Sequence, residues 1–165
     1  MRKELNWISK TTGKKSRGYY EDADDFSSLP SEKVKSVCAF CLYDGRFLIV
    51  KNEGRWEPVA GHVEKGEDLQ TALEREIKEE SNMKVLKTFP IGYFYGEQDD
   101  FYQTRYFCLV EPYGPFVADP DGGVTEVKLV TSEELLKLVD WKDTSLMMRD
   151  KCLKIVYNLG IKLLV

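Results

Sequence analysis

The sequence has little of what zinc-binding, membrane and nucleic-acid-binding proteins commonly carry: one histidine, no long apolar run and no excess of basic residues. A membrane-spanning helix needs roughly 20 consecutive apolar residues, and the apolar runs here are far shorter. The N-terminus also lacks the apolar core of a signal peptide. We therefore expect no membrane contact, and the absence of targeting signals makes the cytoplasm the default location.

The balance of charge is slightly acidic, with a net charge of −4 and an isoelectric point near 5.2. Proteins that bind nucleic acid or anionic membranes through their overall charge are usually basic, so this composition argues against both partners. Hydrophobic residues make up 42% and charged residues 32% of the 165 residues, which is typical of one soluble globular domain. A metal ion or a few Lys and Arg side chains could still bind phosphate locally.

The sequence has four cysteines, and their spacing does not favour a zinc site or a disulfide framework. Cys38 and Cys41 have the C-x2-C spacing of zinc ligands, but they fall in a strand-like run, where residues i and i+3 point to opposite faces. There is no second C-x2-C pair, and the single histidine, His62, lies in a glycine-containing loop and has no assigned role. We expect four buried, reduced thiols, the other two being Cys108 and Cys152.

The stretch from residue 57 to residue 83 is the most informative part of the chain. It starts as a loop with glycines at positions 61 and 66 and continues as a predicted helix, whose first turn the carboxylate of Asp68 can cap. Asn82 fits a left-handed stop at the other end of the helix. At 3.6 residues per turn the helix has one apolar stripe, formed by Leu69, Ala72, Leu73 and Ile77.

Three glutamates disturb this amphipathic pattern. Glu76, Glu79 and Glu80 are related by i, i+3 and i+4 spacing, and they cluster on or beside the apolar stripe. They also lie near the negative end of the helix dipole, which disfavours acidic side chains. Crowded, partly buried carboxylates need a counter-charge, and a divalent cation would supply one. On helix geometry alone two interpretations remain open, a solvated charged face and a metal site.

The residues from Gly61 to Met83 resemble the Nudix signature, G-x5-E-x7-R-E-U-x-E-E-x-G-U, in which U is a bulky aliphatic residue. Gly61 is followed after five residues by Glu67, and seven more residues lead to Arg75. Every fixed position matches except the last glycine, which is Asn82 here. Asn is the residue other than glycine that best tolerates a left-handed C-cap, so this departure is mild. On this signature the chain resembles the Nudix hydrolase family.

The resemblance implies a loop–helix–loop that holds Mg²⁺ or Mn²⁺ against the diphosphate of a small-molecule nucleotide substrate. Glu67 and Arg75 would pair and orient Glu76, and Glu76 or Glu80 could serve as the general base. Oxygen-only ligands select Mg²⁺ or Mn²⁺ over zinc. The metal-facing groups that the resemblance implies are three carboxylates and one backbone carbonyl, those of Glu76, Glu79, Glu80 and Ala60.

Substrate contacts are expected mainly from residues outside the signature. In part of the family the base comes from a later loop, which makes Asp119, Asp121 and Glu126 further candidates, beside the alternative that they are plain turn residues. Gly61 would let the backbone approach a phosphate closely. Trp56 could stack on a base, although aromatic residues of strands more often belong to the core.

Outside the signature, short apolar runs separated by turns predict an α/β fold. Residues 34–43 and 46–51 flank Asp44-Gly45, a strong signal for a β-hairpin. The remaining elements are expected as strands at residues 56–60, 84–95, 101–111 and 126–130, and as helices at residues 132–139 and 144–159. Together with the signature helix they predict an α/β/α sandwich on a mixed β-sheet, similar to the Nudix fold.

The first 33 residues are treated as an N-terminal extension to a single Nudix-like domain of residues 34–165. The extension has a basic start and an acidic end, and its aromatic residues, such as Trp7 and Tyr19, favour partial order. An added strand and a dimer arm are alternatives, so a homodimer remains open. A nucleic-acid-binding arm is weakly supported, because the acidic segment offsets the basic one.

Three functions are compatible with these features. The first is a metal-dependent pyrophosphohydrolase that cleaves a phosphoanhydride in a nucleoside diphosphate linked to another group. The second is a non-catalytic nucleotide-sensing module, which would not need every catalytic carboxylate. The third is an isoprenoid diphosphate isomerase on the same fold, which would need a catalytic cysteine, whereas Cys38 and Cys108 are expected in strand cores. The complete carboxylate set favours the hydrolase, and the substrate is not identified.

Overall fold

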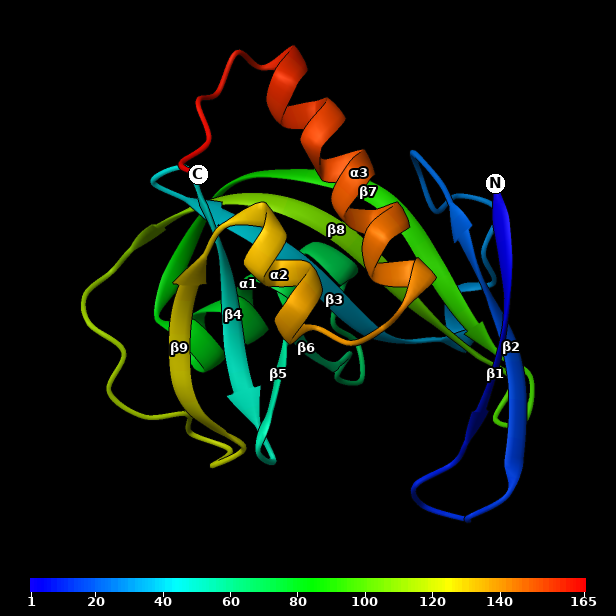
Figure 1. Cartoon of the computed structure of the whole chain (residues 1–165). Helices are drawn as coiled ribbons and strands as arrows, with labels where there is room; N and C mark the ends of the chain where they lie inside the picture. Colours follow the sequence, from blue (N-terminus) through cyan, green and yellow to red (C-terminus); the bar gives the residue numbers. More distant parts are fainter.

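The computed structural model describes all 165 residues and has a mixed α/β architecture (Figure 1). Its strands are β1 (Arg2–Ile8), β2 (Lys15–Asp22), β3 (Val34–Tyr43), β4 (Arg46–Asn52), β5 (Arg55–Glu57), β6 (Val59–His62), β7 (Met83–Gly96), β8 (Phe101–Pro112) and β9 (Val124–Val130). Its helices are α1 (Leu69–Ser81), α2 (Ser132–Leu138) and α3 (Asp143–Asn158), with a short 3₁₀ turn at Ser31–Lys33. None of these helices combines the length and the apolar character needed to cross a membrane.

All nine strands belong to one sheet, in the order β1-β2-β7-β8-β3-β4-β5. β6 also pairs with β3, and β9 with β4. The β3–β8 pair is parallel and the other pairs are antiparallel, so the predicted mixed sheet is confirmed. β3 is buried along most of its length, which is the pattern of a strand covered on both faces.

Helices cover both faces of the sheet (Figure 1). α1 packs on one face, where Leu73 and Ile77 share a core with Val37 of β3. α2 and α3 cover the other face, where Leu135 and Met148 share a second core with several aromatic side chains. Successive residues of β3 serve the two cores in turn, because side chains alternate along a strand. The predicted α/β/α sandwich is therefore confirmed.

The chain between β4 and α1 differs from the single strand expected at residues 56–60. β5 ends at Glu57 and pairs with β4, whereas β6 begins at Val59 and pairs with β3. Pro58 separates them, because it has no N–H to donate to a sheet ladder. The break moves the chain across the sheet and brings β6 against α1.

Residues 2–22 form a β-hairpin that extends the sheet. β1 pairs with β2, and β2 pairs with the second half of β7, from Gly92 to Gly96. Position 18 must be glycine for steric reasons, because a Cβ there would overlap the carbonyl oxygen of Tyr95 on the neighbouring strand. The hairpin occupies the end of the sheet beside the start of α3 (Figure 1).

The four cysteines have the burial that the sequence predicts. All four are buried and free of disulfides. Cys41 and Cys108 lie opposite each other in the β3–β8 pair, and burial raises the pKa of Cys38 to about 12. The expectation of buried, reduced thiols is confirmed.

Candidate active site

The signature helix α1 begins and ends as predicted. The Asp68 carboxylate accepts a hydrogen bond from the Thr71 N–H at 2.8 Å, which caps the first turn. Asn82 has φ 54° and ψ 36°, in the left-handed region, and its N–H donates to the Lys78 carbonyl at 2.8 Å. Its side-chain Nδ2 also donates to the carbonyl of Pro115 at 3.0 Å, a bond that glycine could not make. Asn82 therefore caps the helix and holds the loop after β8 against it.

Gly61 packs directly against the carboxylate of Glu76. A Cβ at Gly61 would overlap all three atoms of that carboxylate group. The backbone of Gly61 does not have positive φ, so space rather than backbone conformation requires glycine here. Glu76 is 7% exposed. The loop and the helix thus enclose this carboxylate between them.

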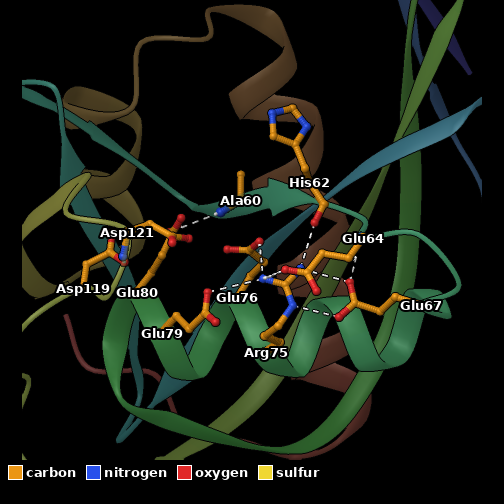
Figure 2. Close-up of polar contacts among 10 residues, drawn as sticks. All are labelled: Ala60, His62, Glu64, Glu67, Arg75, Glu76, Glu79, Glu80, Asp119 and Asp121. Carbon is orange, nitrogen blue, oxygen red and sulfur yellow. Dashed lines mark hydrogen bonds and ion pairs between the residues drawn. The ribbon is translucent and has the colours of Figure 1, made fainter.

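Arg75 ties the loop to the helix (Figure 2). Its Nε and Nη2 donate to the two carboxylate oxygens of Glu67 at 2.7 and 2.9 Å, which is a bidentate pair. Its Nη1 donates to Glu76 Oε1 at 2.8 Å and to Glu79 Oε2 at 3.3 Å, and Nη2 also donates to the His62 carbonyl at 2.9 Å. The bonds from Arg75 lower the pKa of Glu67 to about 2. One guanidinium therefore fixes the loop and two glutamates of α1.

Glu80 lies one turn beyond Glu76 and is 8% exposed. Its Oε2 accepts a hydrogen bond from the Ala60 N–H at 3.4 Å, whereas the ion pairs of Arg75 go to other glutamates. Burial, together with the negative charge of Glu76, raises the pKa of Glu80 to about 8. The structure thus buries two neighbouring carboxylates and provides a cationic partner for one of them.

Acidic side chains from two other parts of the chain also act on Glu80 through their charge. Asp119 and Asp121 lie beside it in the loop that precedes β9 (Figure 2). The Asp119 carboxylate accepts hydrogen bonds from the backbone N–H of Asp121 at 3.0 Å and of Val124 at 2.8 Å, so it orders this loop. Its charge contributes to the raised pKa of Glu80, and that of Asp121 contributes to the raised pKa of Glu76.

Glu57, at the end of β5, is a further candidate for the site that the sequence pattern did not single out. Burial raises the pKa of its carboxyl, and its negative charge is another cause of the raised pKa of Glu80. The signal in the sequence is only that Glu57 is an acidic residue directly before Pro58, in the run that leads into the signature. Its significance depends on the strand break at that proline, which the sequence did not predict.

A cavity of about 430 Å³ opens beside the more exposed part of this cluster. It lies between α1 and the loop after β8, and Arg75, Glu79 and Pro120 are among its lining residues. The Glu79 side chain is 27% exposed, compared with 9% for that of Glu76. Glu79 is therefore the glutamate of the two that a ligand in this cavity reaches more easily.

The donor set suits a hard divalent cation. The candidate ligands are carboxylates and a backbone carbonyl, which are the groups that Mg²⁺ and Mn²⁺ prefer. Glu80 is buried among other acids without an ion-pair partner, and a cation would supply the missing counter-charge. No three acidic, histidine or cysteine side chains converge as ligands of one ion, and Glu76 instead binds Arg75. The residues fit such an ion in their chemistry and burial.

Two of the predicted substrate-binding residues lie apart from the α1 glutamates. Trp56 packs against the core of the face covered by α2 and α3, with Lys51 Nζ 5.6 Å from the centre of its ring. Glu126 is 56% exposed and forms an ion pair with Lys51, with 3.3 Å between Oε1 and Nζ. Neither side chain has a hydrogen bond or ion pair with the glutamates of α1.

Comparison with known proteins agrees with this geometry. The family model described as the NUDIX domain matches residues 32–150, which is more than half of the chain. No curated protein is a match. The solved structure of the Bacillus subtilis pyrophosphohydrolase BsRppH is 20% identical, with a TM-score of 0.67, and the alignment covers 92% of this chain and 96% of that one.

Two further structures are similar over a shorter part of the chain. A C. elegans Ap4A hydrolase is 20% identical with a TM-score of 0.53, covering 76% of this chain and 98% of its own. A NUDIX-family hydrolase from Clostridium perfringens is 18% identical with a TM-score of 0.59, covering 73% and 96%. At such identities these likenesses show a common fold. The family match includes the signature from Gly61 to Met83 and the strands from β3 to β9, and the chain belongs to the Nudix hydrolase family.

Proposed function

We propose that the chain is a Mg²⁺- or Mn²⁺-dependent pyrophosphohydrolase. Its substrate is a nucleoside diphosphate linked to another group, and the bond cleaved is a phosphoanhydride. The observation that carries the proposal is the pair of buried carboxylates, Glu76 and Glu80, on neighbouring turns of α1. Arg75 and Gly61 fix Glu76 beside Glu79, and Glu80 accepts the Ala60 N–H. Buried acids destabilise a fold unless a positive charge compensates them, so this arrangement is best explained by a bound cation.

The cation would be held by Glu76, Glu79, Glu80 and the backbone carbonyl of Ala60. When bound it would neutralise the diphosphate and supply an activated water, which is the chemistry that attack on an anionic phosphorus centre requires. Arg75 has a positioning role, because each of its nitrogens bonds a protein oxygen of the loop or helix. Glu67 fixes Arg75 in turn through both carboxylate oxygens.

Glu80 is the residue that we assign as the base. Glu76 is bound by Arg75 at 2.8 Å, so its position is fixed by an ion pair. Glu80 accepts only the long hydrogen bond of the Ala60 N–H, which leaves carboxylate oxygen available for a proton from the attacking water. Asp119 and Asp121 lie at the edge of the same cluster, in the loop before β9 (Figure 2), and we expect substrate contacts from them.

The other two functions fit the structure less well. A module that only senses a nucleotide does not need two buried carboxylates on one helix, and Glu80, which has no cationic partner, reduces stability without a cation. An isoprenoid diphosphate isomerase would need a cysteine that reaches its substrate. All four cysteines are buried, which argues against that reaction.

The test is a turnover assay with substrates of several classes, in Mg²⁺, in Mn²⁺ and in chelator. Nucleotide sugars, dinucleoside polyphosphates, ADP-ribose and oxidised nucleoside triphosphates cover the class, and the product masses identify the cleaved bond. Glu80→Gln should lower kcat about 10²- to 10⁴-fold, the range of general-base catalysis. Glu79→Gln should weaken activation by Mg²⁺.

Glu74→Gln is the matched control, because Glu74 is exposed on the same helix and contacts only Gln70, at 3.2 Å. Its kcat should equal that of the parent. Turnover in chelator, or equal rates for Glu80→Gln and Glu74→Gln, would refute the mechanism. Failure of the parent on every substrate class would favour the sensing module instead.

A further inference from the structure

A groove on the other face of the sheet contains a buried arginine without a counter-ion. Two cavities, of about 640 and about 400 Å³, lie among the β1–β2 hairpin, β5 and the connection from α2 to α3. They adjoin, because four residues line both of them: Lys10, Arg55, Asp140 and Trp141. Arg105 of β8 lines the larger cavity.

The guanidinium of Arg105 is bound from several sides but remains unneutralised. The residue is 7% exposed, its Nε donates to Gln103 Oε1 at 3.2 Å, and its Nη1 contacts Met148 Sδ at 3.1 Å. Nη2 has no protein acceptor. The side-chain polar atoms that are sealed from solvent and lack a partner are Asp22 Oδ1 and Thr104 Oγ1, so Nη2 is not sealed. Nη2 therefore opens to the groove. A buried cation that forms no ion pair leaves a place for an anion.

Aromatic rings surround the same guanidinium. Its central carbon lies 4.6 Å from the ring centre of Trp141, 5.4 Å from that of Tyr20 and 5.5 Å from that of Phe94. Trp7 of the hairpin packs on Phe94, with 5.4 Å between ring centres. Aromatic faces around one charged donor suit a ligand that has both a flat ring and an anionic oxygen.

One acidic residue, Glu57, lies near both the groove and the acidic cluster. Glu57 lines its smaller cavity, and the charge of Glu57 acts on Glu80. Lys10 and Arg55 add positive charge to both cavities, where Asp140 adds negative charge. Glu4 and Asp143 also line the larger cavity, and Asp143 pairs with Lys3 at 2.7 Å. The larger cavity is thus lined by five basic side chains and three acidic ones, and the basic five are Lys3, Lys10, Arg55, Arg105 and Lys142.

We propose that this groove binds the part of the substrate that is not hydrolysed, with a flat ring among the aromatic side chains and a phosphate oxygen on Arg105 Nη2. The proposal rests on the proposed function, since the diphosphate of the same molecule lies at the α1 glutamates. It narrows the substrate to a nucleotide conjugate whose non-reacting part carries a phosphate group of its own. The β1–β2 hairpin, which lies outside the matched residues 32–150, supplies one wall of this groove.

The experiment is equilibrium binding in chelator, where cation-dependent binding at the glutamates is removed. The chain has three tryptophans, Trp7, Trp56 and Trp141, and all line the groove, so their fluorescence reports its occupation. The probes are 5′-AMP, adenosine and inorganic phosphate. AMP should bind at least about tenfold more tightly than adenosine, a difference of about 1.4 kcal/mol. Inorganic phosphate should compete with AMP.

Arg105→Met should abolish this preference for AMP, and Arg105→Lys should restore part of it. Lys10→Ala should weaken AMP binding several-fold, whereas Lys14→Ala is its control, because Lys14 is exposed in the same hairpin and does not line the groove. Thermal unfolding establishes which variants fold. If Arg105→Met does not fold, the comparison of AMP with adenosine in the parent and in the two lysine variants decides the question.

Equal binding of AMP and adenosine by the parent would overturn the proposal, and so would unchanged AMP binding in a folded Arg105→Met variant. The Glu80→Gln variant should still bind AMP as the parent does, because Glu80 lies outside the lining of the groove. Loss of turnover with intact AMP preference would therefore count against the proposed reaction alone. Turnover without that preference would count against the groove alone.

Discussion

The two faces of the sheet bury opposite charges, and on each face one buried charged side chain has no ion-pair partner. On the α1 face, Glu76 and Glu80 are buried acids, and Arg75 pairs with Glu76. On the α3 face, Arg105 is a buried base that forms no ion pair with an acid. Burying a charge without a partner destabilises a protein, so both regions fit a ligand that completes them. The first fits a cation and the second an anion.

The two regions differ in how their charges are held. Arg75 makes hydrogen bonds to four protein groups, which fixes the glutamates relative to the loop. Arg105 has one amide oxygen, one sulfur atom and aromatic faces around it, with one nitrogen left open. Fixed geometry favours chemistry at a defined atom, whereas an open donor among flat surfaces favours binding. This difference agrees with the two proposals, the reaction on the α1 face and recognition on the α3 face.

The fixed geometry of the α1 face is broken most directly by Gly61→Ala. The new Cβ would occupy the space of the Glu76 carboxylate, so that side chain or the loop must move. We expect kcat to fall at least about 100-fold, the effect of displacing a catalytic group by about 1 Å. Steady-state kinetics at saturating Mg²⁺ measures this fall.

The control is Gly114→Ala, where a Cβ would meet Asn82 Nδ2 at an ordinary contact distance of 3.5 Å. It should leave kcat unchanged. AMP binding in chelator should be the same in both alanine variants, because neither glycine lines the groove. A Gly61→Ala enzyme with the kcat of the parent would show that the position of Glu76 does not limit the reaction.

The role of Arg75 is tested by Arg75→Lys, which keeps the charge and loses the forked donor. Lysine cannot bond both oxygens of Glu67 while it also reaches Glu76 and the His62 carbonyl. We expect kcat to fall about 10- to 100-fold, which is typical when a residue that orients metal ligands is lost. The dependence of rate on Mg²⁺ should shift to higher concentration.

Arg149→Lys makes the same exchange at a site remote from the cluster, where Arg149 pairs with the adjacent Asp150. It should have the kinetics of the parent. Equal kinetics for the two lysine variants would mean that charge alone, without the fork, is sufficient at position 75.

When no cation is bound on the α1 face, the stability of the folded chain should depend on pH through Glu80. Because the pKa of Glu80 is raised to about 8 in the folded chain, this residue favours folding fully below pH about 4.5 and loses that effect as pH rises to about 8. Glu80→Gln, which cannot ionise, should not show the loss. In chelator the unfolding temperature of the parent should therefore fall relative to that of the variant across this interval.

Added Mg²⁺ should close the gap, since a ligand of the folded state stabilises it by mass action. The stabilisation by Mg²⁺ should be smaller in Glu80→Gln than in the parent. Parallel stability profiles for parent and variant in chelator would show that Glu80 is not buried in its charged form. Thermal unfolding followed by circular dichroism gives both comparisons.

The α1 face could be predicted from the sequence because its parts are close together along the chain. The spacing from Gly61 to Met83 predicted the helix, its two caps and the family. Glu57 could not be predicted as a candidate from the sequence. Its position near Glu80 results from the strand break at Pro58, which a local sequence pattern does not indicate. The fold class was predictable for the same local reason, since each strand and helix has its own short pattern.

The groove could not be predicted, because its parts come from distant segments. Trp7, Arg105 and Trp141 are brought together only when the β1–β2 hairpin joins the sheet beside β7. The basic and acidic halves of residues 1–33 indicated an extension but not its pairing partner. Arg105 lies in a run of strand residues, and nothing in its neighbours along the chain indicates that it is buried without a counter-ion.

The smallest expected effect concerns Asn82, where the signature has glycine. Asn82→Gly keeps the left-handed cap but removes the hydrogen bond to the Pro115 carbonyl, so we expect a loss of about 0.5–1.5 kcal/mol in unfolding free energy. Asn82→Ala removes the bond and also strains the backbone, so its loss should exceed that of glycine by about 1 kcal/mol. Denaturant unfolding measures both. A glycine variant as stable as the parent would show that Asn82 serves only as a cap, and a glycine variant less stable than the alanine variant would show that the left-handed conformation is not what the position requires.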